Sequence, residues 1–203
     1  MELVVYVLLG VTSVVGLTFI IERAFALRWR RVVPNEIEAA VHSCRTPEDV
    51  PMLTRVCQEH DSPMSRLLLA AAEHLNWPKA DNVDAMQTRA RHEMVRLERG
   101  LVVLEIIVGI APLLGLVGTI VGMMSAFGDV GQSLNNAAKL ARDIATILNA
   151  TLLGLLIAIP SLIFWSYYNK KVEAIAVEME TLCDEFIRRQ YREQSTPPMM
   201  EAT

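Results

Sequence analysis

Three long apolar runs dominate the pattern of hydrophobic and polar positions along the chain. Leu3–Ile21, Gly109–Phe127 and Ile144–Tyr168 contain no charged residue. A helix of about 20 apolar residues, rising about 1.5 Å per residue, crosses the roughly 30 Å hydrocarbon core of a bilayer. The pattern therefore predicts an all-α integral membrane protein with three transmembrane helices. The predicted spans are residues 1–21, 101–127 and 142–168.

Small residues recur at helical spacing in the second and third spans. They are Ala111, Gly115, Gly118, Gly122 and Ala126 in the second span, and Ala150, Gly154 and Ala158 in the third. Such a face lets the backbone of another helix come very close, which a single-span anchor does not need. We therefore expect a packed multi-helix assembly. Pro160 removes a backbone donor and crowds the carbonyl of Leu156, which predicts a kink near one end of the third span.

The polar residues inside the spans are few. Thr119 lies on the small-residue face of the second span, and Thr146, Asn149 and Thr151 lie in one half of the third. Each can act as an interhelical hydrogen-bonding group worth about 1 kcal/mol, or as part of the polar lining of a cavity. Both interpretations stay open for Thr119 and Thr151, whereas the interhelical one is favoured for Asn149.

Neither the second nor the third span has a titratable residue near its centre. Glu105 lies close to the start of the second span, where a salt bridge to Arg99 or an interfacial position is favoured over a role as a proton exit group. A proton relay through lipid needs a titratable group at depth. We therefore expect that this chain alone conducts protons poorly.

The distribution of Lys and Arg predicts the orientation. Basic residues follow the first span, precede the second and follow the third, and only Lys139 and Arg142 lie on the opposite side. By the positive-inside rule the amino terminus faces outward and the carboxyl terminus is cytoplasmic. The remaining segments are a cytoplasmic helical region 22–100, an external loop 128–141, a cytoplasmic helix 169–194 and a disordered tail 195–203.

The cytoplasmic segments carry helix signals. Thr46–Asp49 has the form of a helix start with a capping hydroxyl and a proline at the first position, and Ser62-Pro63 repeats it. The helix that starts at Ser62-Pro63 is expected to extend to about Leu75. Another helix covers Val83–Arg99 and is expected to run on into the second span, with Gly100 as a weak point. After the third span an apolar stripe at three-four spacing predicts a helix packed on partners. Its members are Val172, Ile175, Met179, Leu182 and Phe186.

No enzyme chemistry is indicated. The chain has no GxxxxGK[ST] or HExxH motif, so it is not expected to be an ATPase or a protease, and we expect no cofactor and no nucleic acid. Cys44, Cys57 and Cys183 are odd in number and lack a CxxC pair, which is typical of reduced structural thiols. Pairing two of them with His42 and His60 as a zinc set is rejected, because structural sites keep tighter spacing.

Four segments together resemble a known family. APLLGLVGTIVGM in the second span and GLLIAIPSLIFWSYYN in the third are similar to the MotA/TolQ/ExbB proton-channel family, as is IIERAFALR after the first. DSPMSRLLLAA resembles the SPLxR segment of its three-span ExbB and TolQ branch. MotA itself has four spans, which this sequence lacks.

The resemblance implies a stator subunit of the bacterial inner membrane. It implies a homopentameric ring around a dimer of a single-span partner of the ExbD/TolR type, acting with a TonB-like or TolA-like protein. Thr119 and Thr151 match the family's threonines that face the pore and the partner. Thr146 stands where ExbB and TolQ commonly carry a glutamate; Asp143, one turn earlier, either substitutes for that carboxylate or caps the helix.

Other functions remain open at this stage. A non-conducting membrane scaffold would use the small-residue faces for packing alone. A secondary transporter is disfavoured, because three spans without an inverted repeat or a broken helix do not match that architecture. Within the family, the sequence does not separate iron-siderophore uptake, envelope maintenance, gliding or other energised processes.

Overall fold

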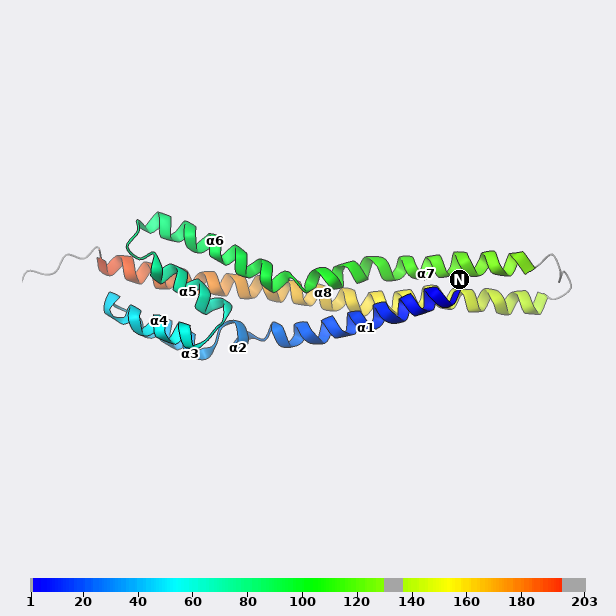
Figure 1. The fold of residues 1–203 in the computed structure, drawn as a ribbon, viewed down its shortest axis with the longest axis horizontal. Helices are drawn as coiled ribbons and strands as arrows, with labels where there is room; N and C mark the ends of the chain where they lie inside the picture. The colour runs from blue at the N-terminus through cyan, green and yellow to red at the C-terminus, as the bar shows by residue number, and fades with distance from the viewer. Residues whose placement is uncertain (1, 130–136, 195–203) are drawn as a thin grey trace, which may run out of the picture. The chain divides into compact units, whose positions relative to one another are not determined.

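In a computed structural model the chain is described over residues 2–129 and 137–194, and those residues form helices and no strand. A few side chains within these ranges are not described, that of Asp143 among them. The tail 195–203 and the centre of the expected external loop lie outside the described residues. The elements (Figure 1) are α1 Glu2–Ala26, α2 Trp29–Val32, α3 Asn35–Ser43, η1 Pro47–Asp49 (a 3-10 turn), α4 Val50–Glu59, α5 Pro63–Glu73, α6 Lys79–Glu98, α7 Leu101–Asp129 and α8 Ala137–Gln194.

Three of these helices are long and apolar enough to cross a membrane, which confirms the predicted number of spans and the all-helical fold. The candidate spanning segments are Leu3–Ala26, Leu101–Phe127 and a stretch within Ile144–Arg192. The last belongs to α8, a single helix of 58 residues. The chain divides into two compact units. The first contains Met1–Phe25 and Arg99–Asn169, and the second contains Ala26–Glu98 and Lys170–Thr203.

The first unit consists of α1, α7 and the first part of α8. The Tyr168 hydroxyl donates to the backbone carbonyl of Ile20 at 2.9 Å and so ties α8 to α1. At Gly100, between α6 and α7, an added Cβ would meet the guanidinium of Arg23. The helix expected to run from Val83 into the second span is instead interrupted at its predicted weak point, because α6 ends at Glu98 and α7 begins at Leu101.

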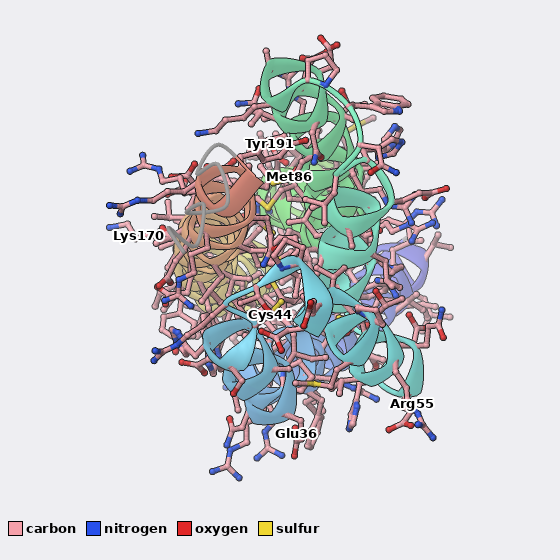
Figure 2. All side chains as sticks on the ribbon, turned by 90° about the vertical axis from the view of Figure 1, so that its left-hand side faces the viewer. Glu36, Cys44, Arg55, Met86, Lys170 and Tyr191 are labelled. Atoms are coloured by element: carbon pink, nitrogen blue, oxygen red, sulfur yellow. The ribbon has the colours of Figure 1, made fainter. Side chains whose placement is uncertain are left out.

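The second unit consists of α2–α6 and the remainder of α8. Figure 2 shows Glu36 and Arg55 pointing outward, whereas Cys44 lies among the helices. The apolar stripe predicted on α8 is confirmed as part of this core, since all five of its members are buried. The core also holds Leu53, Leu67, Leu68 and Ile187.

The predicted helix starts are also confirmed. The Thr46 amide and hydroxyl both donate to Asp49 Oδ2 at 2.9 Å, and the Ser65 amide donates to Ser62 Oγ at 3.1 Å. One boundary was wrong: α5 ends at Glu73, two residues before the expected Leu75, and the ring of His74 packs against that of Trp77 beyond its end, with the two planes tilted by 58°.

The three cysteines of the second unit are free and buried. Burial raises the pKa of each thiol, and that of Cys57 reaches about 11. Among the described residues, no group of three or more His, Cys, Asp or Glu is arranged to hold a metal ion. These thiols are therefore core side chains with low nucleophilicity.

Candidate functional site

The backbones of α7 and α8 are in direct contact in the first unit. A Cβ added at Gly154 would lie 2.6 Å from the carbonyl oxygen of Ala111, and one added at Gly115 would lie 2.9 Å from the carbonyl oxygen of Ala150. Real Cβ atoms do not approach backbone so closely. Only glycine is compatible with this crossing, and it places Thr151 directly against α7.

The other predicted packing residues extend the same contact. An added Cβ at Gly118 would lie 2.7 Å from the Cβ of Ala150, and one at Gly122 would lie 2.7 Å from Cγ1 of Ile147. The Cβ added at Gly118 would also lie 3.1 Å from Cγ1 of Val5 in α1. The residues of the predicted packing set are all buried within this unit: Ala111, Gly115, Gly118, Gly122, Ala150, Gly154 and Ala158.

Thr119 and Thr151 lie beside this crossing and border one groove. The Thr151 hydroxyl donates to the backbone carbonyl of Gly115 on α7 at 3.2 Å. The Thr119 hydroxyl donates to Leu116 of its own helix at 2.7 Å. The groove has a volume of about 610 Å³. Its lining residues are Thr119, Ile120, Met123, Met124, Phe127, Ile144, Ile147, Leu148 and Thr151.

Among the lining residues that the structure describes, none has a titratable side chain. The side-chain polar groups of this described lining are the hydroxyls of Thr119 and Thr151. A hydroxyl both donates and accepts, so it can hydrogen-bond to a carboxylic acid, a carboxylate or a water molecule. Alone, this lining can orient a titratable group or a water but cannot store a proton at neutral pH.

The remaining predicted polar residues lie elsewhere. Thr146 is exposed, and its hydroxyl donates to the carbonyl of Arg142 in its own helix at 3.0 Å. Asn149 is exposed on α8, and the side chain of Asp143 lies outside what the structure describes. Glu105 is exposed, and within the described residues no ion pair joins it to Arg99. The salt-bridge alternative for Glu105 was therefore wrong, and the interfacial alternative stays a prediction.

Pro160 lies inside α8, which continues through it, and the kink expected there stays a prediction. A second internal proline, Pro112, was overlooked although the sequence shows it inside an apolar run.

A further cavity of about 420 Å³ lies between α1 and α8 and was also not anticipated. Pro160 and Ser161 line it, and the Ser161 hydroxyl donates to the carbonyl of Ile157 at 2.8 Å.

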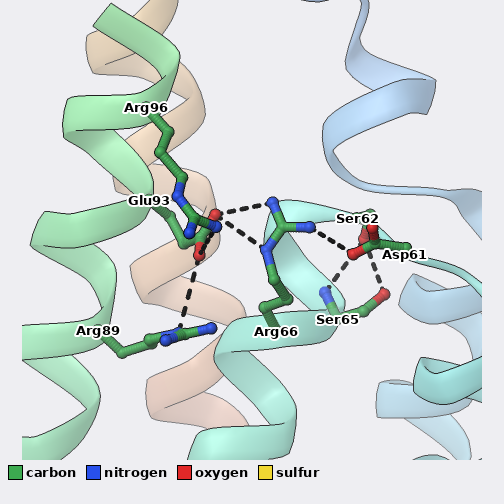
Figure 3. A network of polar contacts seen from close by, with 7 residues as sticks. All are labelled: Asp61, Ser62, Ser65, Arg66, Arg89, Glu93 and Arg96. Atoms are coloured by element: carbon green, nitrogen blue, oxygen red, sulfur yellow. Dashed lines mark hydrogen bonds and ion pairs between the residues drawn. The ribbon is translucent and has the colours of Figure 1, made fainter. Parts of the chain in front are cut away.

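The second unit contains a buried glutamate surrounded by arginines (Figure 3). Glu93 of α6 has only 1% of its side chain exposed. Arg66 of α5 donates to Glu93 Oε2 from Nε at 3.1 Å and from Nη2 at 2.8 Å. Arg96 donates to Glu93 Oε1 at 3.2 Å, and Arg89 lies 3.7 Å from the same oxygen. Arg66 also pairs with Asp61.

This cluster fastens α5 to α6. The hydrogen bonds that Arg66 donates to Glu93, together with the negative charges of Glu93 and Asp61, raise the pKa of the Arg66 guanidinium, so this guanidinium stays charged. Sequence analysis missed the cluster, although a signal was present. Glu93 falls three residues after Ala90 and four before Leu97, on the face of α6 that is otherwise buried.

Comparison with known proteins identifies the family. Residues 59–181 match the model of the MotA/TolQ/ExbB proton channel family, and the chain belongs to this family. It is therefore a multi-pass membrane protein of a transport family, not of an enzyme family. The matched range contains α7, the groove and the Arg66–Glu93 pair.

Individual relatives carry ExbB names. The chain is 28% identical, over 84% of its length, to a protein named as an ExbB homolog in Methanothermobacter thermautotrophicus. It is 29% identical over 51% of its length to the biopolymer transport protein ExbB of Aquifex aeolicus, and 34% identical over 47% to that of Helicobacter pylori. The aligned segments cover 61%, 70% and 62% of these three proteins, respectively.

Proposed function

We propose that this chain is the multi-copy subunit of a proton-driven stator in the bacterial inner membrane. With a single-span partner of the ExbD/TolR type, it couples the proton motive force to mechanical work on the outer envelope. Family membership and the biopolymer transport names of its relatives support this proposal. The orientation inferred from the basic residues, with the amino terminus outside, belongs to the same proposal.

The observation that carries the proposal is the groove between α7 and α8. Its described lining offers two threonine hydroxyls and no titratable side chain. A proton path through lipid needs such a group, and ionisable residues inside a membrane are expensive enough that they mark function. The partner helix supplies the missing carboxylate, and Thr119 and Thr151 orient it directly or through water.

The assembly proposed around this site is a pentameric ring of the chain enclosing a dimer of the partner. Within one copy, the small-residue faces of α7 and α8 make their tightest contacts with each other. The exposed residues of the groove are then the surface that contacts the partner helix. Thr146, Asn149 and Asp143 lie toward the outer end of α8, where Asp143 either substitutes for the absent family glutamate or caps the helix. A TonB-like or TolA-like protein transmits the movement.

Proton flux into proteoliposomes that contain the chain with its partner tests this function. Replacing Thr119 and Thr151 together by valine keeps the side-chain shape and deletes both hydroxyls. The expected flux falls at least tenfold while the complex stays assembled, whereas Thr146→Val changes it less than twofold. Wild-type flux in the double variant excludes the lining role. Equal flux without the partner would contradict the proposal that the partner helix supplies the carboxylate.

One observation favours the scaffold as a second candidate. The Thr151 hydroxyl is already engaged with the carbonyl of Gly115, as an interhelical hydrogen bond would be in a purely structural helix pair. A scaffold predicts no partner-dependent flux in any variant. The same assay therefore separates the two functions.

A further inference from the structure

Two exposed patches of opposite charge lie on different helices of the second unit. The basic patch on α6 comprises Arg91, His92, Val95 and Arg96. The acidic patch on α8 comprises Glu173, Val177, Glu178 and Glu180. All eight residues are exposed.

The basic patch surrounds an exposed valine. Val95 is 65% exposed, one helical turn after Arg91. Between Thr88 and Leu97 the only carboxylate is Glu93, whose side chain is buried beneath the arginine cluster. The charge presented to solvent by this stretch of α6 is therefore entirely positive.

The acidic patch has the complementary composition. Val177 is 64% exposed and has Glu173 one turn before it and Glu180 one turn after it. From Val172 to Ile187 the chain contains no Lys or Arg. Further along α8, Asp184 and Glu185 pair with Arg188 and Arg189. By contrast, Glu173, Glu178 and Glu180 make no ion pair within the described residues.

The two patches do not cover one another within a chain, since both valines are about two-thirds exposed. Exposed valines ringed by charges of one sign indicate a partner of the opposite sign. The same chain carries that partner surface, so two neighbouring copies of the chain can satisfy both patches, one patch each. By sequence, Val95 precedes the apolar run of α7 and Val177 follows that of α8 by no more than about three helical turns.

We propose that the basic patch of one copy docks on the acidic patch of the next. This inference rests on the proposed ring and adds to it the contact that joins neighbouring copies outside the membrane. Because the two surfaces differ, the interface is heterologous, and repeating it closes a ring when the rotation allows. Contacts between two basic or two acidic patches are disfavoured by like charge.

Cysteine cross-linking in membranes of cells that express the full chain with its partner tests the contact. The three native thiols are buried, so the background is low. The chain with both Val95→Cys and Val177→Cys is expected to give a ladder of oligomers on a non-reducing gel after oxidation. Either substitution alone gives monomer, and co-expressing the two single variants gives dimer. Cross-linking of Val95→Cys alone, or monomer only from the double variant, overturns the proposal.

A charge swap provides a second, independent test. Arg91→Glu with His92→Glu should lower the oligomer fraction in native mass spectrometry at least threefold. Glu173→Arg with Glu180→Arg should do the same. Combining all four changes restores opposite charges across the interface and should recover most of the oligomer. No recovery in the combined variant contradicts docking between these patches.

The outcomes separate this inference from the function on which it rests. If the wild-type chain forms oligomers but the double cysteine variant gives no cross-link, the ring is retained and only the proposed contact is excluded. Absence of oligomers in the wild-type chain with its partner removes the ring as well.

Discussion

The two units of this chain are built by opposite packing rules. In the first unit α7 and α8 approach until backbone meets backbone at Gly115 and Gly154. In the second unit large side chains such as Leu53, Met64 and Phe186 fill the space between helices. Burying a leucine out of lipid gains no hydrophobic free energy, so helices in a membrane are stabilised by close backbone contact. In water, burial of apolar area is itself stabilising. Helices of the same geometry are therefore stabilised in different ways in lipid and in water.

The units also treat polar groups differently. The second unit gathers three arginines around the buried carboxylate of Glu93. The described lining of the groove in the first unit holds two hydroxyls and no charged side chain. The ion pairs of the second unit join two of its helices, whereas the described lining of the groove lacks a group that could carry a proton.

Charging the core of the second unit should have the largest effect. Ile175→Asp with Leu182→Asp buries two carboxylates without partners, which should cost about 5 kcal/mol or more and abolish folded yield. Ala174→Asp with Thr181→Asp makes the same pair of changes one residue earlier, at exposed positions. The control should retain wild-type yield in size-exclusion chromatography. Equal yields for both variants would mean that the stripe is not a core.

Removing the charge of Glu93 should be the next most damaging change. Glu93→Gln leaves three guanidinium groups facing a neutral amide, and we expect a loss of about 3 kcal/mol, less than for a fully buried pair because the arginines are partly exposed. The matched control is Glu59→Gln, which breaks only the exposed pair with Arg55 and should cost under about 1 kcal/mol. Thermal unfolding in detergent measures both. A similar melting temperature for the two variants would show that the cluster adds little stability.

The crossing in the first unit should respond to a single methyl group. Gly154→Ala drives a Cβ into the carbonyl of Ala111 and should cost about 2 kcal/mol. Gly109→Ala is the matched control, because nothing lies within 4 Å of its added Cβ, and alanine there should be neutral or stabilising. Resistance to unfolding by SDS should fall in the first variant only. A stabilised Gly154→Ala chain would contradict the backbone contact.

The smallest effect concerns the exposed cap of the second unit. Hydrogen bonds from Thr46 and from the Arg45 amide lower the pKa of Asp49 below its ordinary value of 3.8. A lowered pKa in the folded state means that the ionised carboxylate contributes stability above about pH 4 and loses it as the pH falls through the folded pKa. Wild type should therefore melt slightly above Asp49→Asn at pH 7. The two melting temperatures should converge as the pH falls through the folded pKa of Asp49, and a difference that stays constant with pH would exclude the ionised cap.

Local signals predicted much of the fold. Charge-free runs predicted three spanning helices, and serine or threonine before proline predicted the starts of η1 and α5. The apolar stripe predicted the face of α8 that is buried in the second unit. Each of these features depends on residues within one continuous segment of the chain, so the sequence expresses it directly.

The contacts between elements were harder to predict. Helical spacing placed Gly115 and Gly154 on small-residue faces but did not say that they oppose one another. Glu93 was visible as a polar residue on an apolar face, yet its partner Arg66 lies 27 residues away on another helix. The Glu105–Arg99 salt bridge was plausible from spacing alone, and the structure does not form it.

By itself, then, the sequence determined the helices, the family and the lack of a carboxylate at the centre of its second and third spans, because these are properties of composition and local period. Only the tertiary structure decided which glycines meet, that Thr151 bonds to α7, and that the two threonines border one groove. These contacts join segments that are far apart in the chain, and the distance between such segments is set only when the helices pack against one another.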